Sequence, residues 1–371
     1  MRLPEMSRRR LVITATAAAL ALVCVVVLLV PATRHGLVTA WCDITQSACP
    51  PTADDPRRDY ADGAGWRRRL DPVAAATWGN YVALGDSYSS GDGAGDYAEG
   101  TAAVGDCRRS ANAYPRHVVS AHDFAGDLGF FACSSQRGWA MLDSLGEPRS
   151  QIDRVGPHTS LVTIGIGGND VGFTKILRAC MVRVPLVETQ ACTEQEEEIE
   201  KRMRTFGPTL EEIVLEIRER APDARVLVVG YPRLFPGDPD SMYYTMAPHD
   251  QEWLNAITKR FNEQVAEDVA ALDSEIVEAG QTGSVEYVRM YNALKGHEVG
   301  AEDPWLNGVL LSDFANGLEI DRSTFHPNAR GQQEFAERVL DQVEQGPERP
   351  LYAALETLDG ADPEVLAAEL D

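Results

Sequence analysis

The chain has 371 residues, of which 44% are hydrophobic, and its 34 basic and 57 acidic residues give a net charge of −23. A chain of this length and composition can bury one large core or two smaller ones. An anionic surface of this size repels phosphate backbones, which argues against nucleic acid as a partner.

The N-terminal segment has the features of a membrane anchor. Three consecutive arginines, residues 8–10, precede an uncharged run over 11–30 that is long enough to cross a bilayer as a helix. Arginines before a span stay in the cytoplasm, so residues 1–10 are predicted to be cytoplasmic and the remaining chain extracellular after a single span. The alternative is secretion after signal cleavage, although Pro31 makes the end of the run a poor cleavage site.

Residues 31–75 follow the predicted span and contain PPTADDPRRD with little hydrophobic periodicity. Proline and short polar residues punctuate this region, which is typical of a connecting segment. We therefore predict an extracellular linker that holds the next domain away from the membrane.

Cysteine usage agrees with a compartment outside the cytoplasm. Of the seven cysteines, one lies in the apolar run and the others follow it. Disulfides are the expected state there, and no CxxC or HExxH motif indicates a metal; we expect no metal site and no cofactor. Sequence alone does not choose among the pairings. The simplest set joins neighbours: Cys42–Cys49, Cys107–Cys133 and Cys180–Cys192.

Strands and helices alternate over residues 76–345. The short apolar runs NYVALGD, GFFAC, SLVTIGIGG, ARVLVVGY and VEYVRMY are typical of strands buried on both faces. The clearest helical stripe recurs every four residues from Trp253 to Val269, and shorter ones cover 209–220 and 332–343. This alternation predicts one α/β domain with a central parallel sheet between two layers of helices.

The last segment, residues 346–371, is acidic and interrupted by prolines. Such a composition is typical of a segment that does not form a core of its own. A loose tail or a lone surface helix is expected there.

Ser87 lies in the stretch ALGDSYSSGDGAGD, where the first predicted strand runs into a glycine-rich segment. Parallel α/β sheets bind their ligands beyond the carboxyl ends of the strands, which is where this serine stands. The chain lacks the GxSxG elbow of the α/β-hydrolases and the GK[ST] ending of a phosphate loop. Taken alone, the stretch could also be a calcium-binding loop or a plain turn.

Two further stretches accompany this serine: GGND at 167–170 and STFHP at 323–327. In this order, the three blocks resemble those of the SGNH (GDSL-type) hydrolases, and the resemblance covers roughly residues 81–345. It is greatest to the secreted esterases and lipases of actinobacteria. The resemblance implies a flavodoxin-like three-layer α/β/α sandwich that hydrolyses esters.

The resemblance also implies a role for each block. Ser87 would be the nucleophile and His326 the base that takes its proton, because a serine hydroxyl is a weak nucleophile until it is deprotonated. The oxyanion would be bound by the backbone N–H of Ser87, the side-chain amide of Asn169 and the backbone N–H of Ser135. The family usually has glycine at this last position. The cysteines at 107, 133, 180 and 192 fall where the actinobacterial subgroup has two disulfides.

One departure concerns the partner of the histidine. Most of the family carries an aspartate three residues before it, where this chain has Ser323. We expect the backbone carbonyl of Ser323 to orient the ring of His326 in a Ser87–His326 dyad, with Asp321 as the alternative partner.

Three functions remain open at this point. The first is an esterase or lipase that cleaves acyl esters outside the membrane. The second is a deacetylase or acyltransferase of cell-envelope sugars, which would use the same residues. The third is a membrane-anchored binding module that has lost its activity. Acyl length, physiological substrate and oligomeric state do not follow from the sequence.

Overall fold

A computed structural model of the protein describes residues 59–62, 65–103, 106–181, 192–312 and 319–370. Two compact units divide the chain, one made of residues 1–69 with 354–356 and the other of residues 70–353 with 357–371. Strands β1 (Asp59–Asp62) and β2 (Gly65–Leu70) form an antiparallel pair in the smaller unit. The larger unit contains the sheet and helices that follow.

The predicted membrane span over 11–30 and the predicted Cys42–Cys49 pair lie outside the described residues. None of the helices within the described ranges has the length and apolar character that crossing a bilayer requires.

The central sheet has five strands, all parallel, in the order β4-β3-β5-β6-β7. Their chain order across the sheet is second, first, third, fourth and fifth, which is the flavodoxin-like order. The side chains of β3, β5 and β6 are buried on both faces, as the apolar runs predicted. The five predicted strands are confirmed as β3 (Asn80–Gly85), β4 (Leu128–Phe130), β5 (Thr159–Gly165), β6 (Arg225–Val229) and β7 (Ser284–Val288).

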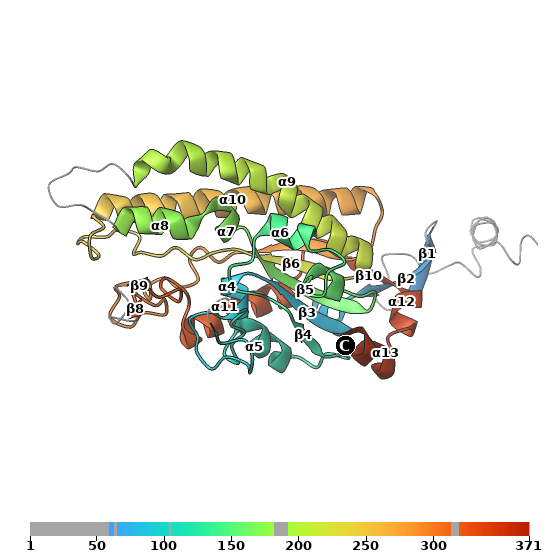
Figure 1. Ribbon diagram of the computed structural model, residues 1–371. Coiled ribbons are helices and arrows are strands. Elements are labelled where there is room, and N and C mark those ends of the chain that lie inside the picture. Colours follow the sequence, from blue (N-terminus) through green and yellow to red (C-terminus); the bar gives the residue numbers. More distant parts are fainter. Residues whose placement is uncertain (1–58, 63–64, 104–105, 182–191, 313–318, 371) are drawn as a thin grey trace, which may run out of the picture. The chain divides into compact units, whose positions relative to one another are not determined.

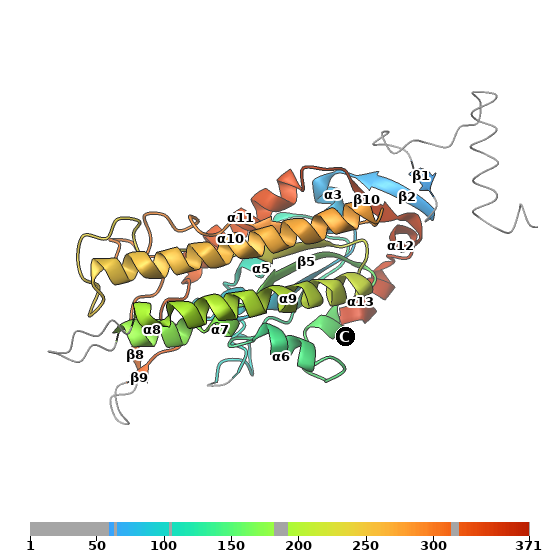
Figure 2. The same ribbon diagram turned by 90° about the horizontal axis from the view of Figure 1, so that it is seen from above.

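Helices cover both faces of this sheet, which gives the predicted three layers (Figure 1). The two longest helices lie side by side on one face, and the other face is covered by shorter helices (Figure 2). The first layer contains α6 (Gly138–Asp143), α9 (Glu196–Arg220) and α10 (Pro248–Glu278), and the second contains α3 (Pro72–Thr77), α5 (Tyr114–Ala121) and α11 (Ala329–Gln345).

Short elements follow the strands and lie at the carboxyl end of the sheet or in the connections. They are α4 (Ser87–Ser90), η1 (Ile152–Arg154), α7 (Gly168–Val171), α8 (Phe173–Met181), η2 (Thr193–Gln195), β8 (Leu311–Ser312) and β9 (Glu319–Ile320).

Two boundaries differ from those that the sequence predicts. Helix α9 (Glu196–Arg220) begins well before the predicted range of 209–220. Pro208 lies inside the helix without ending it, although proline normally breaks or kinks a helix. The predicted linker over 31–75 contains the start of α3, whose first turn is capped by Asp71.

The expected loose tail or surface helix over 346–371 is corrected by the structure. This segment contains β10 (Leu351–Ala354), α12 (Leu355–Asp359) and α13 (Pro363–Leu370). Leu366 of α13 is buried, and its carbonyl accepts a hydrogen bond of 2.8 Å from the side chain of Asn80 on β3. Acidic composition predicted solvation, whereas one buried leucine and this bond attach α13 to the sheet.

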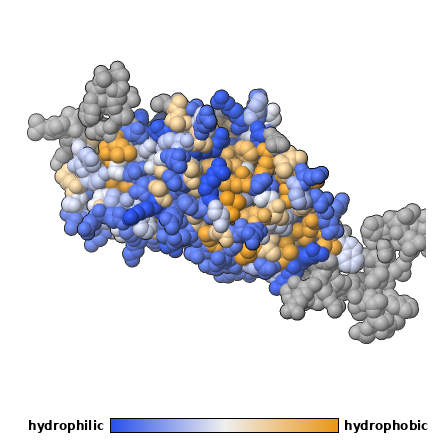
Figure 3. Space-filling model, turned by 90° about the horizontal axis from the view of Figure 1, so that it is seen from below, coloured by the Kyte–Doolittle hydropathy of each residue, from blue (hydrophilic) through white to orange (hydrophobic). Residues whose placement is uncertain are grey.

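Hydrophilic side chains dominate much of the face seen from below, where hydrophobic side chains also gather in one broad region (Figure 3). Such a mixture is ordinary for a folded protein, since apolar atoms contribute more than half of the surface of typical domains.

Candidate active site

Ser87 is the first residue of α4, which follows strand β3 after Asp86. Asp86 caps this short helix by accepting a hydrogen bond of 3.0 Å from the backbone N–H of Tyr88. The end of β3 is fixed by buried Gln151, whose side chain bonds both the N–H and the carbonyl of Gly85 at 2.8 and 3.1 Å. Ser87 therefore stands on a rigid turn, and it lines a cavity of about 240 Å³.

His326 meets this serine from a distant part of the chain. Its Nε2 atom lies 2.7 Å from the Oγ atom of Ser87. Tyr88 supports the histidine loop, because its hydroxyl donates a 2.7 Å hydrogen bond to the carbonyl of Phe325 and its ring lies against the imidazole. A serine hydroxyl bonded to an imidazole nitrogen is the arrangement that general-base activation of a nucleophile needs.

The other ring nitrogen of His326 faces a carbonyl, but not the predicted one. Nδ1 lies 3.1 Å from the backbone oxygen of Thr324. The carbonyl of Ser323 instead accepts the backbone N–H of His326 at 3.1 Å, and Asp321 accepts the backbone N–H of Ser323 at 2.8 Å. Both expected partners are therefore engaged within the turn that presents the histidine, and the carbonyl that meets the ring is one residue later.

Asn169 follows a glycine pair at the end of β5. Gly167 has a φ of +112° and close contact with the ring of Phe206, so a side chain would fit poorly there. The side-chain amide of Asn169 donates to the carbonyl of Gln136 at 2.9 Å and lines the cavity. An amide has two protons, so a second one is available for an oxygen atom in the cavity.

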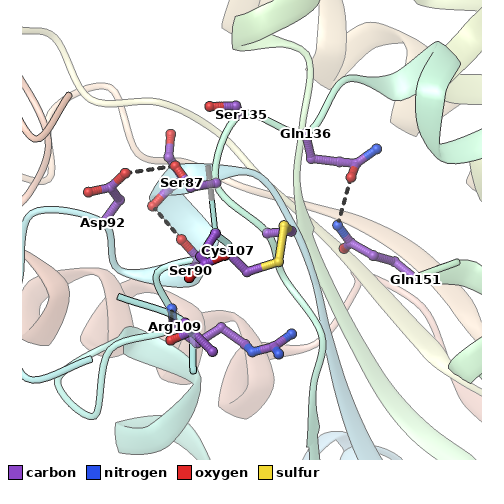
Figure 4. Close-up of a disulfide and its surroundings, with 12 residues drawn as sticks. Ser87, Ser90, Asp92, Cys107, Arg109, Ser135, Gln136 and Gln151 are labelled. Atoms are coloured by element: carbon purple, nitrogen blue, oxygen red, sulfur yellow. Dashed lines mark hydrogen bonds between the residues drawn. A yellow bond between two sulfur atoms is a disulfide. The ribbon is translucent and has the colours of Figure 1, made fainter. Parts of the chain in front are cut away.

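Ser135 reaches the same cavity from the segment after β4. Its φ of +69° is in the left-handed region, which is unfavourable for residues other than glycine. The disulfide between Cys107 and Cys133 lies beside this segment (Figure 4). The backbone N–H of Ser134 also bonds the carbonyl of Cys107 at 3.0 Å, so the conformation of Ser135 is supported by its neighbours.

The cavity has an apolar side that begins next to Ser87. Helix α8 contributes Phe173, Leu177 and Met181, and the segment after β6 contributes Leu234. A pocket of this kind buries hydrocarbon, while the polar groups at its end fix the orientation of the ligand. An ester with an apolar acyl chain fits this distribution of side chains.

Burial and hydrogen bonds shift the pKa values of the ionisable groups at the site. Burial raises the pKa of Asp86 to about 7, against the opposing hydrogen bond of 2.5 Å from the hydroxyl of Tyr231. That hydroxyl also accepts the N–H of Gly168 at 3.1 Å, so it connects the serine turn to the Asn169 turn. Burial lowers the pKa of His326, which keeps the ring neutral and able to accept a proton near neutral pH.

The sequence indicated Asp92 only as part of a possible calcium-binding loop and gave it no role beside His326. Its carboxylate is buried and lies 2.9 Å from Arg108 and 3.1 Å from Arg322. Ser134 also donates a hydrogen bond of 2.7 Å to it. Burial alone would raise the pKa of this carboxyl group. The charge of His326, the hydrogen bond from Ser134 and the Arg108 guanidinium outweigh burial, so the pKa of Asp92 is lowered. Its only signal in the sequence is an acidic residue in the glycine-rich stretch.

Both described disulfides have the partners of the simplest, nearest-neighbour set, and they involve the four cysteines for which the resemblance implied two disulfides. Cys107 is joined to Cys133, and Cys180 to Cys192. Within the part of the chain that the structure describes, no group of three or more His, Cys, Asp or Glu side chains is arranged to hold a metal ion.

A flavodoxin-like parallel sheet with a serine turn after its first strand in chain order, β3, and polar turns from two further segments is typical of the SGNH hydrolases. The chain belongs to the GDSL-like Lipase/Acylhydrolase family, whose sequence profile matches residues 83–334. With relatives named lipase and esterase, it is a carboxylic ester hydrolase.

Relatives from Streptomyces support this assignment over most of their length. Lipase 1 of Streptomyces coelicolor is 31% identical over 271 residues, which cover 73% of this chain and 87% of that protein. Among solved structures, phospholipase A1 from Streptomyces albidoflavus NA297 matches with a TM-score of 0.58 and 29% identity, covering 71% of this chain and 98% of that one. The extracellular lipase from Streptomyces rimosus gives a TM-score of 0.56 at 29% identity, with 71% and 99% coverage.

Proposed function

We propose that this ester hydrolase cleaves acyl esters through an acyl-enzyme on Ser87, with His326 as general base and then general acid. The observation that carries the proposal is the 2.7 Å contact between Ser87 Oγ and His326 Nε2. The apolar side of the cavity supports an apolar acyl group, so lipids and other acyl esters are the proposed substrates.

The first half of the reaction forms the acyl-enzyme. Ser87 Oγ attacks the ester carbonyl carbon while its proton passes to His326 Nε2. The backbone N–H groups of Ser87 and Ser135 and the amide of Asn169 donate hydrogen bonds to the oxyanion that develops. The tetrahedral intermediate then breaks its bond to the alcohol, which leaves with the proton from His326.

The second half regenerates the enzyme. Water attacks the acyl carbon and gives a proton to His326, and the same donors bind the second oxyanion. Collapse of this intermediate releases the carboxylic acid, and the proton on His326 returns to Ser87. The carbonyl of Thr324 keeps the ring in the tautomer that presents Nε2 to the serine.

We place this reaction outside the cytoplasmic membrane. Two disulfides in the hydrolase domain support an oxidising compartment, and a structurally similar relative is an extracellular lipase. Whether residues 11–30 anchor the chain or are cleaved is tested by N-terminal sequencing of the protein recovered from membrane and culture fractions.

Labelling with a fluorophosphonate tests the nucleophile, because the probe reacts with an activated serine beside an oxyanion site. Intact-protein mass spectrometry should find one adduct, and peptide mapping should place it on Ser87. Hydrolysis of a series of acyl esters of increasing chain length should be lost in Ser87→Ala. A Ser87→Ala protein that is still labelled, or that keeps its hydrolytic rate, would overturn the proposal.

A further inference from the structure

Three charged side chains from three segments act electrostatically on His326. Asp92 comes from the loop after α4, Arg108 from the segment that leads to α5, and Arg322 from the histidine's own loop. Tyr88 of α4 packs against the ring, and its hydroxyl donates a hydrogen bond to the carbonyl of Phe325. Asp92 is therefore the negative charge in a group whose other two members are cations.

Asp92 is fixed relative to both Ser87 and His326. Its backbone N–H bonds the carbonyl of Ser87 at 3.0 Å. A Cβ atom added to Gly93 would lie 2.9 Å from the Cβ atom of His326, so the chain directly after Asp92 is in contact with the histidine. The hydroxyl of Ser323 lies 3.3 Å from the Asp92 carboxylate, which ties the histidine loop to it as well.

A negative charge near the ring favours the reaction. When His326 takes the proton of Ser87, the ring becomes an imidazolium ion, and a nearby carboxylate stabilises this ion. In this chain Nδ1 faces the neutral carbonyl of Thr324, which orients the ring but supplies no charge. Two arginines beside the ring would oppose the imidazolium if Asp92 were absent.

We propose that Asp92 is a positioning residue that acts through His326: its buried carboxylate stabilises the imidazolium, in place of the aspartate that position 323 lacks. Asp92 acts through space, and it holds Arg108, Arg322 and the Ser134 hydroxyl in the same network. The direction of the pKa contributions agrees, because Asp92 raises the pKa of His326 whereas Arg322 and Arg108 lower it. This inference rests on the proposed function of His326.

The pH profile of kcat/KM tests the inference, because its acid limb reports the pKa of the base in the free enzyme. In the full-length Asp92→Asn protein, with p-nitrophenyl butyrate as substrate, the acid limb should move to lower pH by about one unit. The plateau value of kcat should fall about tenfold, the equivalent of one pKa unit of lost imidazolium stabilisation. Asp96→Asn removes an exposed carboxylate from the same loop and should leave the limb unmoved.

The Arg322→Gln variant should shift the acid limb of the pH profile in the opposite direction. Removing a cation beside the ring should raise the pKa of His326 and move the acid limb to higher pH. Opposite shifts of the acid limb in Asp92→Asn and Arg322→Gln support the inference. Acid limbs that stay within about 0.2 pH unit of wild type in both folded variants overturn it. Residual hydrolysis by Ser87→Ala would instead show that the proposed function has failed. Circular dichroism identifies a variant that does not fold, and the other variant then decides.

Discussion

The backbone oxygen of Thr324 lies 3.1 Å from Nδ1 of His326, whose Nε2 lies 2.7 Å from the Oγ atom of Ser87. A carbonyl fixes the same tautomer that a triad aspartate would fix, because it also accepts a hydrogen bond from Nδ1–H. It is part of the backbone, so side-chain substitutions nearby leave it in place. The orientation of the ring by this carbonyl is therefore separate from the stabilisation of its charge that we propose for Asp92.

Asp321→Asn tests this separation. The asparagine oxygen can still accept the backbone N–H of Ser323, so the turn is kept, and kcat should stay within about threefold of wild type. A true triad carboxylate would cost roughly 10³–10⁴ in kcat, the scale seen in serine proteases. Steady-state kinetics of the purified variant, with its fold checked by circular dichroism, distinguishes the two. A loss of the larger size would return Asp321 to the role of orienting partner.

Asn169→Ala should lower kcat by roughly 10²–10³, as expected for the loss of one oxyanion donor, with a smaller change in KM. The same amide also bonds the carbonyl of Gln136 at 2.9 Å, so a structural role is the competing explanation. Thermal unfolding of the variant separates them. If kcat changes less than threefold while the melting temperature falls, the Asn169 side chain stabilises the turn and does not donate a hydrogen bond to the oxyanion.

Ser135→Gly should stabilise the protein by about 1 kcal/mol, because glycine adopts a left-handed φ without the penalty that other residues incur. The backbone N–H is retained, so kcat should stay within about threefold. Ser134→Gly is the matched control: Ser134 lacks a positive φ, and its hydroxyl bonds Asp92 at 2.7 Å, so this change should destabilise the fold. Urea unfolding measures both, and equal effects at 134 and 135 would contradict the conformational argument.

The sequence was sufficient to predict the sheet. Strands β3, β5 and β6 are apolar runs buried on both faces, and such runs differ clearly from the helical stripes between them. The segment containing Leu366 was harder, because one buried leucine in an acidic helix leaves no periodic pattern. Its attachment depends on Asn80, which is nearly three hundred residues earlier in the chain.

Within the site, the three sequence blocks predicted Ser87, Asn169 and His326 as site residues, and the structure brings these residues to one cavity. Thr324 was missed because counting residues cannot tell which of two successive carbonyls a turn directs at the ring. Asp92 was missed for another reason. Its importance comes from the charges that surround it, Arg108 and Arg322, and these meet only when three separate segments fold together.

The two described disulfides should affect the enzyme differently. They link residues 26 and 12 positions apart, so each should contribute about 3 kcal/mol in the chain-entropy model. The Cys107–Cys133 bond, however, stands next to Ser135, and Arg108 directly follows its first cysteine (Figure 4). The Cys180–Cys192 bond instead joins the end of α8 to the residue before η2.

Replacing both cysteines of each pair by serine tests this difference. The Cys180→Ser/Cys192→Ser protein should lose about 3 kcal/mol of unfolding free energy and keep kcat within about threefold. The Cys107→Ser/Cys133→Ser protein should lose a similar free energy and, in addition, at least tenfold in kcat, because the Ser135 N–H is then less firmly held toward the oxyanion. Kinetics measured well below each variant's unfolding temperature separates the two effects. Equal kcat values for the two double variants would show that the first bond contributes to stability alone, and that Asp92 and the Cys107 carbonyl suffice to hold the segment.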